Sequence, residues 1–193
     1  MTGLPTLLRR LAIYNTFKTR AEAVSAEVHR FPTRATALDF VLQILRSEGV
    51  GNGQQASAVW ADSAFLATGN QEELAKIPGL SFEVTREKAA AARVGISRLD
   101  WAVANTGTLV QDAAPVERRL ASTLPNIHIA LVSTANLVPD MTAVFSRIQP
   151  QQTNYISMIT GPSRTADIER VLTIGVHGPE RLIIVFVDED GMA

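Results

Sequence analysis

The 193-residue chain contains no cysteine. It therefore forms no disulfide, offers no thiolate to a metal and has no cysteine nucleophile. Because iron–sulfur clusters are held mainly by cysteine thiolates, we expect the chain to ligate no ordinary cluster by itself. Its three histidines, His29, His128 and His177, lie far apart in the sequence without the spacing of a transition-metal site. We expect neither a metal nor another cofactor in this chain.

The chain also lacks an excess of charge of one sign. Its 18 basic and 19 acidic residues give a net charge of −1 at pH 7, so we expect no strongly basic face for nucleic acid. No apolar run approaches the roughly 18 residues that cross a bilayer. Arg9 and Arg10 interrupt the apolar stretch that a secretory signal would need. The sequence thus predicts a cytoplasmic protein without a transmembrane segment.

Helical and strand-like segments alternate along the chain. Helices are expected at 4–20, 34–48, 70–76, 86–93, 140–148 and 166–174, from the spacing of apolar residues. Short apolar runs typical of buried strands occupy 58–60, 81–85, 99–105, 127–132, 155–160 and 182–187. This alternation predicts an α/β fold with a mainly parallel sheet flanked by helices.

The amphipathic, basic helix at 4–20 precedes the alternating pattern. We expect it to form a peripheral N-terminal arm within residues 1–30, followed by an α/β domain at 31–193. Such a helix packs on its own domain, docks a partner subunit or lies on a membrane surface. If it is peripheral, its removal leaves a folded domain.

Hydroxyl-rich loops follow three of the predicted strands, at 106–108, 133–136 and 161–167. Ligands of open α/β sheets bind outside the carboxyl ends of the strands. If the strands are parallel, these loops converge on one edge of the sheet. The candidate residues for binding a small organic acid or phosphate are Thr106, Gly107, Thr108, Gly161, Ser163, Arg164 and Thr165.

The loop before the predicted helix at 166–174 has the residues of an anion site. Thr165 stands at the N-cap position, and Asp167 stands in the first helical turn. Backbone N–H groups and the Arg164 guanidinium would then face an anion together. In the alternative, Arg164 pairs with Asp167 or Glu169 and only fixes the loop. Since Thr165 and Asp167 already serve the helix start, we expect Arg164 to act on a ligand.

Five motifs follow one another in order along the last two thirds of the chain, at 94–97, 104–109, 120–130, 159–169 and 175–179. Together they resemble the LUD domain family, and most closely its lactate utilization protein C branch. The resemblance covers residues 80–190 well and the first third weakly. His177, in the last motif, is a candidate base or ligand, or a residue that shapes its turn.

The resemblance implies a fold similar to the NagB/RpiA/CoA-transferase group. It also implies a role in oxidising L-lactate to pyruvate, beside two cysteine-rich partner subunits that carry iron–sulfur clusters. This chain would then be the cluster-free component, binding a small anionic metabolite or a partner, with Asp167, Glu169 and His177 in supporting roles.

Two other functions stay open. CoA-transferase relatives use a glutamate nucleophile, but Glu117 stands beside Arg118 and Arg119 without a motif around it. One alternative is therefore a stand-alone enzyme acting on sugar phosphates or acyl-CoA with residues that the sequence does not identify. The other is a regulatory module that senses an organic acid. Whether this chain is catalytic alone is left undecided.

The absence of cysteine gives a first testable prediction. The purified chain should be colourless and contain no stoichiometric iron, because no thiolate is present to hold a cluster. Elemental analysis of an untagged preparation checks this. One or more iron atoms per chain would contradict the cluster-free assignment.

Overall fold

The computed structural model describes residues 3–51, 56–65, 71–148, 153–166, 172–174 and 177–188. A six-stranded sheet in the order β1-β12-β7-β4-β2-β3 runs through its centre, and all paired neighbours are parallel. The strands are β1 (Glu27–Phe31), β2 (Ala58–Trp60), β3 (Leu80–Ser81), β4 (Val94–Arg98), β7 (Ile127–Ser133) and β12 (Arg181–Val187). The predicted α/β fold with a mainly parallel sheet is confirmed.

Two smaller sheets accompany the central one. The first contains β8 (Leu137–Val138), β5 (Trp101–Val103), β6 (Thr108–Asp112) and β9 (Ile156–Ile159), in that order. The second is an antiparallel pair of β10 (Arg164–Ala166) and β11 (Leu172–Ile174). Helices are α1 (Gly3–Ala23), α2 (Arg34–Ser47), α3 (Gln71–Leu74), α4 (Arg86–Ala91), α5 (Val116–Thr123) and α6 (Met141–Phe145), with 3-10 turns η1 (Ser63–Phe65) and η2 (Thr134–Asn136).

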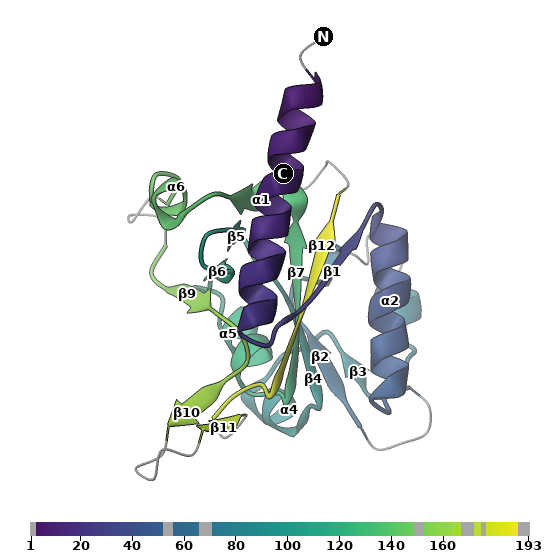
Figure 1. Cartoon of the computed structure of the whole chain (residues 1–193). Coiled ribbons are helices and arrows are strands. Elements are labelled where there is room, and N and C mark those ends of the chain that lie inside the picture. Colours follow the sequence, from purple (N-terminus) through teal and green to yellow (C-terminus); the bar gives the residue numbers. More distant parts are fainter. Residues whose placement is uncertain are drawn as a thin grey trace.

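Alternate residues of β7 serve opposite faces of the central sheet. Ile127 and Ile129 belong to the apolar cluster beneath α2, whereas Ala130 and Val132 belong to the cluster beneath α1. Figure 1 shows α2 on one side of the sheet, with α1 and the small sheet on the other. Because both faces are covered, β7 is apolar almost throughout, as expected for a parallel strand.

Helix α2 begins and ends where local chemistry requires. The Thr33 side chain accepts a hydrogen bond from the backbone N–H of Thr36 at 3.2 Å. Gly49 follows the helix with a φ of 89°, and the N–H of Val50 donates to the carbonyl of Leu45 at 2.8 Å. Glycine adopts this left-handed conformation without strain. The helix predicted at 34–48 is therefore confirmed.

Helix α1 is not peripheral along its whole length. Tyr14 and Phe17 are buried and meet Phe186 of β12 edge to face, with ring centroids 5.5 and 5.1 Å apart. Strand β1, which begins at Glu27, pairs with β12 inside the central sheet. A division at residue 30 therefore cuts through one structural unit. Only the first half of α1 projects beyond the sheet (Figure 1), and there Leu8 is 60% exposed.

Two predicted elements are wrong. The strand expected at 99–105 is present only as the shorter β5, which lies in the small sheet, and the strand of the central sheet in this region is β4, which precedes the predicted range. The helix expected at 166–174 is contradicted at both of its ends, because Arg164–Ala166 pairs with Leu172–Ile174 as antiparallel strands. Thr165, Thr173 and Ile174 are β-branched, which favours strands over helices. Asp167 and Glu169 lie outside the described residues.

None of the helices in the described ranges is both long and apolar enough to cross a bilayer.

The packing of α1 gives a second prediction. Phe17→Ala should lower the free energy of unfolding by about 3–5 kcal/mol, since it removes a fully buried ring from the core. Leu8→Ala, on the projecting turn of the same helix, should change it by less than about 0.5 kcal/mol. Urea denaturation of both variants measures the difference. Equal and small changes in the free energy of unfolding in both variants would mean that α1 is peripheral along its whole length.

Candidate functional site

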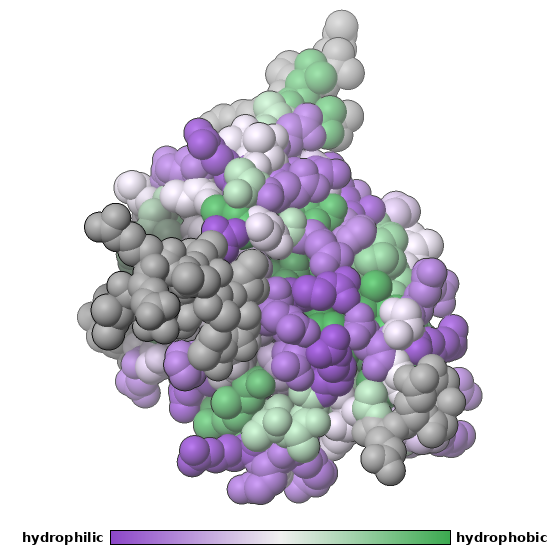
Figure 2. Space-filling model, turned by 60° about the horizontal axis from the view of Figure 1, so that its bottom comes forward, coloured by the Kyte–Doolittle hydropathy of each residue, from purple (hydrophilic) through white to green (hydrophobic). Residues whose placement is uncertain are grey.

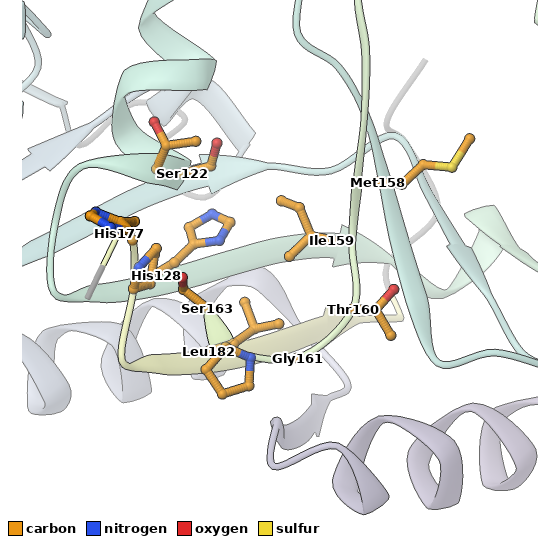
Figure 3. A pocket seen from close by; sticks show the side chains of 13 residues that line it. Ser122, His128, Met158, Ile159, Thr160, Gly161, Ser163, His177 and Leu182 are labelled. Atoms are coloured by element: carbon orange, nitrogen blue, oxygen red, sulfur yellow. The ribbon is translucent and has the colours of Figure 1, made fainter. Parts of the chain in front are cut away.

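A cavity of about 240 Å³ lies beside the amino-terminal ends of β7 and β12. His128 of β7 and Leu182 of β12 form its floor, on the sheet face that also carries α1. The last turn of α5, strand β9 and two loops at 160–163 and 177–179 supply the walls. Figure 3 shows the His128 ring at the end of the pocket near Ser122, with Met158 and Thr160 at the other end.

The two loops hold one another in place. The backbone N–H of Ser163 donates to the carbonyl of Pro179 at 2.8 Å. Gly178 has a φ of +144°, and a Cβ added there would lie 3.1 Å from the Ser163 Cβ. A side chain at residue 178 would therefore be strained and would press the loops apart. The motifs at 159–169 and 175–179, distant in the sequence, thus form adjoining walls of one cavity.

The surface around this end of the sheet is mainly polar. Figure 2 looks at the molecule from the bottom of Figure 1, the side on which the amino-terminal strand ends lie. Among the residues drawn in colour, hydrophilic ones dominate that view, and hydrophobic ones form separate patches. Such a surface suits contact with water and small polar molecules more than broad contact with a membrane.

A buried polar network supports the cavity floor. The side-chain amide of Gln111 donates to Ser97 Oγ at 3.0 Å and to the carbonyl of Arg98 at 2.8 Å. Ser97 Oγ lies 2.9 Å from His128 Nε2. Ser97 Oγ accepts a hydrogen bond from Gln111. Among the described contacts, the Ser97 hydroxyl has no acceptor other than His128 Nε2, and this favours the tautomer in which Nε2 is unprotonated.

The other nitrogen of His128 is left without a partner. Burial lowers the pKa of His128 from 6.5 to about 3, so the ring is neutral at pH 7. A neutral ring with an unprotonated Nε2 carries its proton on Nδ1. Within the described residues, this Nδ1 is buried and makes no hydrogen bond. One nitrogen of this ring is therefore buried beneath the cavity without a hydrogen bond to the described residues.

Several other polar side chains of the cavity form hydrogen bonds within the protein. Ser122 and Thr123 both donate to the carbonyl of Arg119 within α5. Thr160 Oγ1 shares a hydrogen bond with Thr108 at 2.9 Å. The lining residues are Ser122, Thr123, His128, Met158, Ile159, Thr160, Gly161, Pro162, Ser163, His177, Gly178, Pro179 and Leu182. None of these residues is a lysine or arginine, so the described walls carry no ammonium or guanidinium group.

Some of the residues predicted from the sequence meet at this cavity. Gly161, Ser163 and His177 line it. Thr108 contacts the wall through Thr160. The expected ligand-binding roles of these residues stay predictions, because no bound molecule defines them.

Other predicted site residues lie elsewhere. Thr106 is exposed, and Gly107 turns against the end of α1, where an added Cβ would lie 2.5 Å from the backbone nitrogen of Ala21. The Arg164 guanidinium donates to the carbonyl of Val24 at 2.7 Å and to Ser25 Oγ at 2.8 Å. Arg164 therefore ties β10 to the turn after α1.

Thr165 does not cap a helix as expected. It lies in β10, which pairs with β11 as an antiparallel strand. The side chain of Thr165 and all of Asp167 and Glu169 fall outside the described part of the structure.

The three hydroxyl-rich loops do not converge on one edge. Loop 106–108 is the turn between antiparallel strands β5 and β6. Loop 133–136 follows the carboxyl end of β7 and borders a different cavity of about 500 Å³. There Arg30 pairs with Asp188 at 2.9 Å and lies over the Tyr14 ring. Loop 161–163 lies at the opposite, amino-terminal edge of the sheet.

The sequence-based search did not identify His128, Ser97 or Gln111 as parts of a site. A signal was present, because His128 stands inside the apolar run at 127–132. A polar side chain within a fully buried strand needs a partner. No spacing rule points to Ser97 and Gln111, since only the fold brings the three strands together. Among the residues in the described ranges, no group of three or more His, Asp or Glu could hold a metal ion.

Comparison with known proteins establishes the family. The LUD domain family model matches residues 14–187, which is most of the chain. The chain belongs to the LUD domain family. Its last motifs, at 159–169 and 175–179, lie within the matched region and contribute the two loops of the cavity.

Several relatives of this LUD chain carry the name Lactate utilization protein C. The one from Exiguobacterium sp. (strain ATCC BAA-1283 / AT1b) is 42% identical over 113 residues, covering 55% of this chain and 49% of the relative. That from Shouchella clausii (strain KSM-K16) is 32% identical over 148 residues, covering 71% and 64%. That from Bacillus subtilis (strain 168) is 36% identical over 109 residues, covering 53% and 45%. The aligned part is thus about half the length of most of these relatives.

A solved structure has a similar fold. The crystal structure of a DUF162 family protein from Deinococcus radiodurans, at 1.70 Å resolution, matches with a TM-score of 0.62. The match covers 92% of this chain and 98% of that protein at 19% sequence identity. At this identity the likeness establishes the shared fold.

The buried imidazole gives a third prediction. Between pH 7 and pH 5 the unfolded chain protonates His128, whereas the folded chain, with a pKa of about 3, does not. Stability therefore falls as the pH falls through this range, by about 2 kcal/mol from this group. Urea denaturation at both pH values should show this loss in the wild type beyond that in His128→Asn, which does not titrate. Equal losses would mean that His128 is not held neutral.

Proposed function

We propose that this LUD chain is the cluster-free component of a system that oxidises L-lactate to pyruvate. The observation that carries the proposal is the set of relatives named Lactate utilization protein C, at 32–42% identity in three examples. Because the chain spans about half the length of most of them, the activity of the whole system is assigned to it as a proposal. Its place of action in this proposal is the cytoplasm.

Lactate oxidation needs an electron acceptor as well as a binding site for the acid. Conversion of the 2-hydroxyl to a 2-oxo group removes two electrons and two protons, so the system requires an electron acceptor. A chain without cysteine has no thiolates with which to hold an iron–sulfur cluster. We therefore assign electron transfer to two cysteine-rich iron–sulfur partner subunits. This chain contributes binding of the small organic acid, in the cavity around His128.

The position of Glu117 weighs against the acyl-transfer alternative. Glu117 is exposed in the first turn of α5, whereas the cavity is lined by Ser122 and Thr123 in the last turn of the same helix. The two ends of an eight-residue helix lie about 10 Å apart. A carboxylate at Glu117 is thus badly placed to attack a thioester held in the cavity.

Growth on lactate tests the proposal and is our fourth prediction. Deleting the gene should abolish growth on L-lactate as the sole carbon source and leave growth on pyruvate or glucose unchanged. The wild-type gene should restore growth. A Ser163→Phe copy should not, because the larger side chain fills the cavity that Ser163 lines.

A matched control variant distinguishes the effect of filling the cavity from a general loss of folded protein. Ser47→Phe makes the same exchange at an exposed position in the last turn of α2, away from the cavity. This copy should restore growth, with both variants present at wild-type levels by immunoblot. Normal growth of the deletion strain on lactate would contradict the proposed function. A deletion strain that oxidises lactate normally but fails to induce genes in response to it would favour the sensing module instead.

A further inference from the structure

A second cavity, of about 500 Å³, lies at the opposite edge of the central sheet. It is bordered by Arg30 of β1, by Thr134 after β7 and by Asp188 after β12. These residues stand near the carboxyl ends of three neighbouring parallel strands. Figure 1 shows β12 pointing to the same side of the sheet as the projecting half of α1. Ligands of open α/β sheets bind outside the carboxyl ends of the strands, so this cavity has the position of a binding site.

The guanidinium of Arg30 is held in this cavity from two sides. Its Nε donates to the two carboxylate oxygens of Asp188, at 2.9 and 3.1 Å. Its Cζ lies 4.8 Å from the centre of the Tyr14 ring, which is a cation–π distance. Neither contact uses the two Nη groups as hydrogen-bond donors, and the Arg30 side chain is 33% exposed. A cation in a fixed position therefore borders the cavity with most of its N–H donors unused by the described residues.

A second cation stands on the helix side of the cavity. Arg10 of α1 lines it and is exposed. Asp188 is the one acidic residue among the described lining residues, so two arginines face one aspartate and leave an excess of one positive charge. The cavity beside His128, by contrast, has no lysine or arginine in its described walls. An anion therefore gains more electrostatic stabilisation in the larger cavity.

Apolar side chains supply the rest of the lining. Leu11 and Ile13 come from α1, Ala135 from η2 and Leu137 from β8. Leu11 is 46% exposed, so apolar surface lies open to water beside the guanidinium groups. A ligand that covers this surface is stabilised by the hydrophobic effect. The volume of about 500 Å³ lies within the range of roughly 300–1,000 Å³ that is usual for small-molecule sites.

We propose that this cavity binds an amphiphilic organic anion. Arg30 and Arg10 hold its carboxylate or phosphate head group, since a guanidinium suits both through paired, charge-assisted hydrogen bonds. Its apolar tail covers Leu11, Ile13 and Leu137. Asp188 and Tyr14 are positioning residues, which keep the Arg30 guanidinium in place. The inference goes beyond the proposed function and does not depend on it.

The experiment, our fifth prediction, is titration of the purified full chain with hexanoate, hexyl phosphate and hexanol. The three probes share one hydrocarbon tail and differ in the head group. Isotope-edited NMR follows the backbone amide signals and gives the dissociation constants. At least one of the two anions should bind at least about tenfold more tightly than hexanol, which forms no charge-assisted hydrogen bond. The anion that binds more tightly identifies the head group.

The same titration locates the site and tests the tail. Signals of α1 and of residues 133–137 should shift, because these segments border the cavity. Acetate has the head group of hexanoate without most of its tail. It should bind at least about tenfold more weakly than hexanoate, because it leaves the apolar wall uncovered.

Three arginine variants test the head-group contacts. Affinity for the tighter anion should fall at least about tenfold in Arg30→Gln and about threefold in Arg10→Gln, where the cation is more exposed. Arg20→Gln is the matched control, since Arg20 is exposed on the same helix, roughly 15 Å along the axis from Arg10, and does not line the cavity. This variant should bind as the wild type does.

Thermal unfolding of each variant measures any loss of stability. Arg30→Gln removes the ion pair with Asp188, so its stability can fall together with its affinity. Arg10 makes no hydrogen bond or ion pair with the described residues, so Arg10→Gln reports on binding even if Arg30→Gln is poorly folded.

Four results would overturn the inference. They are no binding of either anion at millimolar concentration, equal binding of hexanol and both anions, signal shifts confined to the cavity beside His128, and an Arg20→Gln variant that loses as much affinity as Arg10→Gln. Tighter binding of one anion with loss in the two cavity variants supports it. Because the titration contains no lactate, its result is independent of the proposed function.

Discussion

The close approach of α5 to β4 is the contact on which the cavity depends. At Gly95 an added Cβ would lie 2.0 Å from the carbonyl oxygen of Ala121, so only glycine lets the helix backbone rest on the strand. Gly95 pairs with His128 in the neighbouring strand. The same contact brings Ser122 to 3.5 Å from the Gln111 amide oxygen. A helix seated farther out would open the wall beside His128 and uncover the polar network.

That network buries three polar side chains within an apolar sheet, which by itself lowers the stability of the fold. Ser97, Gln111 and His128 are buried, although each side chain would be well hydrated in the unfolded chain. Their mutual hydrogen bonds offset much of this cost, but His128 Nδ1 gains none within the described structure. Burying a ring nitrogen without a hydrogen bond is unfavourable for folding.

The strongest local patterns gave correct predictions, whereas elements decided by distant contacts did not. The apolar runs of β7 and β12 and the cap at Gly49 follow from local chemistry, and all three are found. Strand β4 was missed because Gly95 and Ser97 suit a buried strand only when α5 and His128 lie against them. The β10–β11 hairpin was mistaken for a helix. Of the candidate site, the two loop motifs were found and the imidazole between them was not.

The protonation of the His128 ring tests the central claim most directly. Long-range proton–nitrogen NMR of the ligand-free protein at pH 7 distinguishes the two ring nitrogens and shows which one carries the proton. The account predicts a neutral ring with its proton on Nδ1, the form favoured by the Ser97 contact with Nε2 and by the lowered pKa of His128. A proton on Nε2, or a ring that carries both protons at pH 7, would contradict the account.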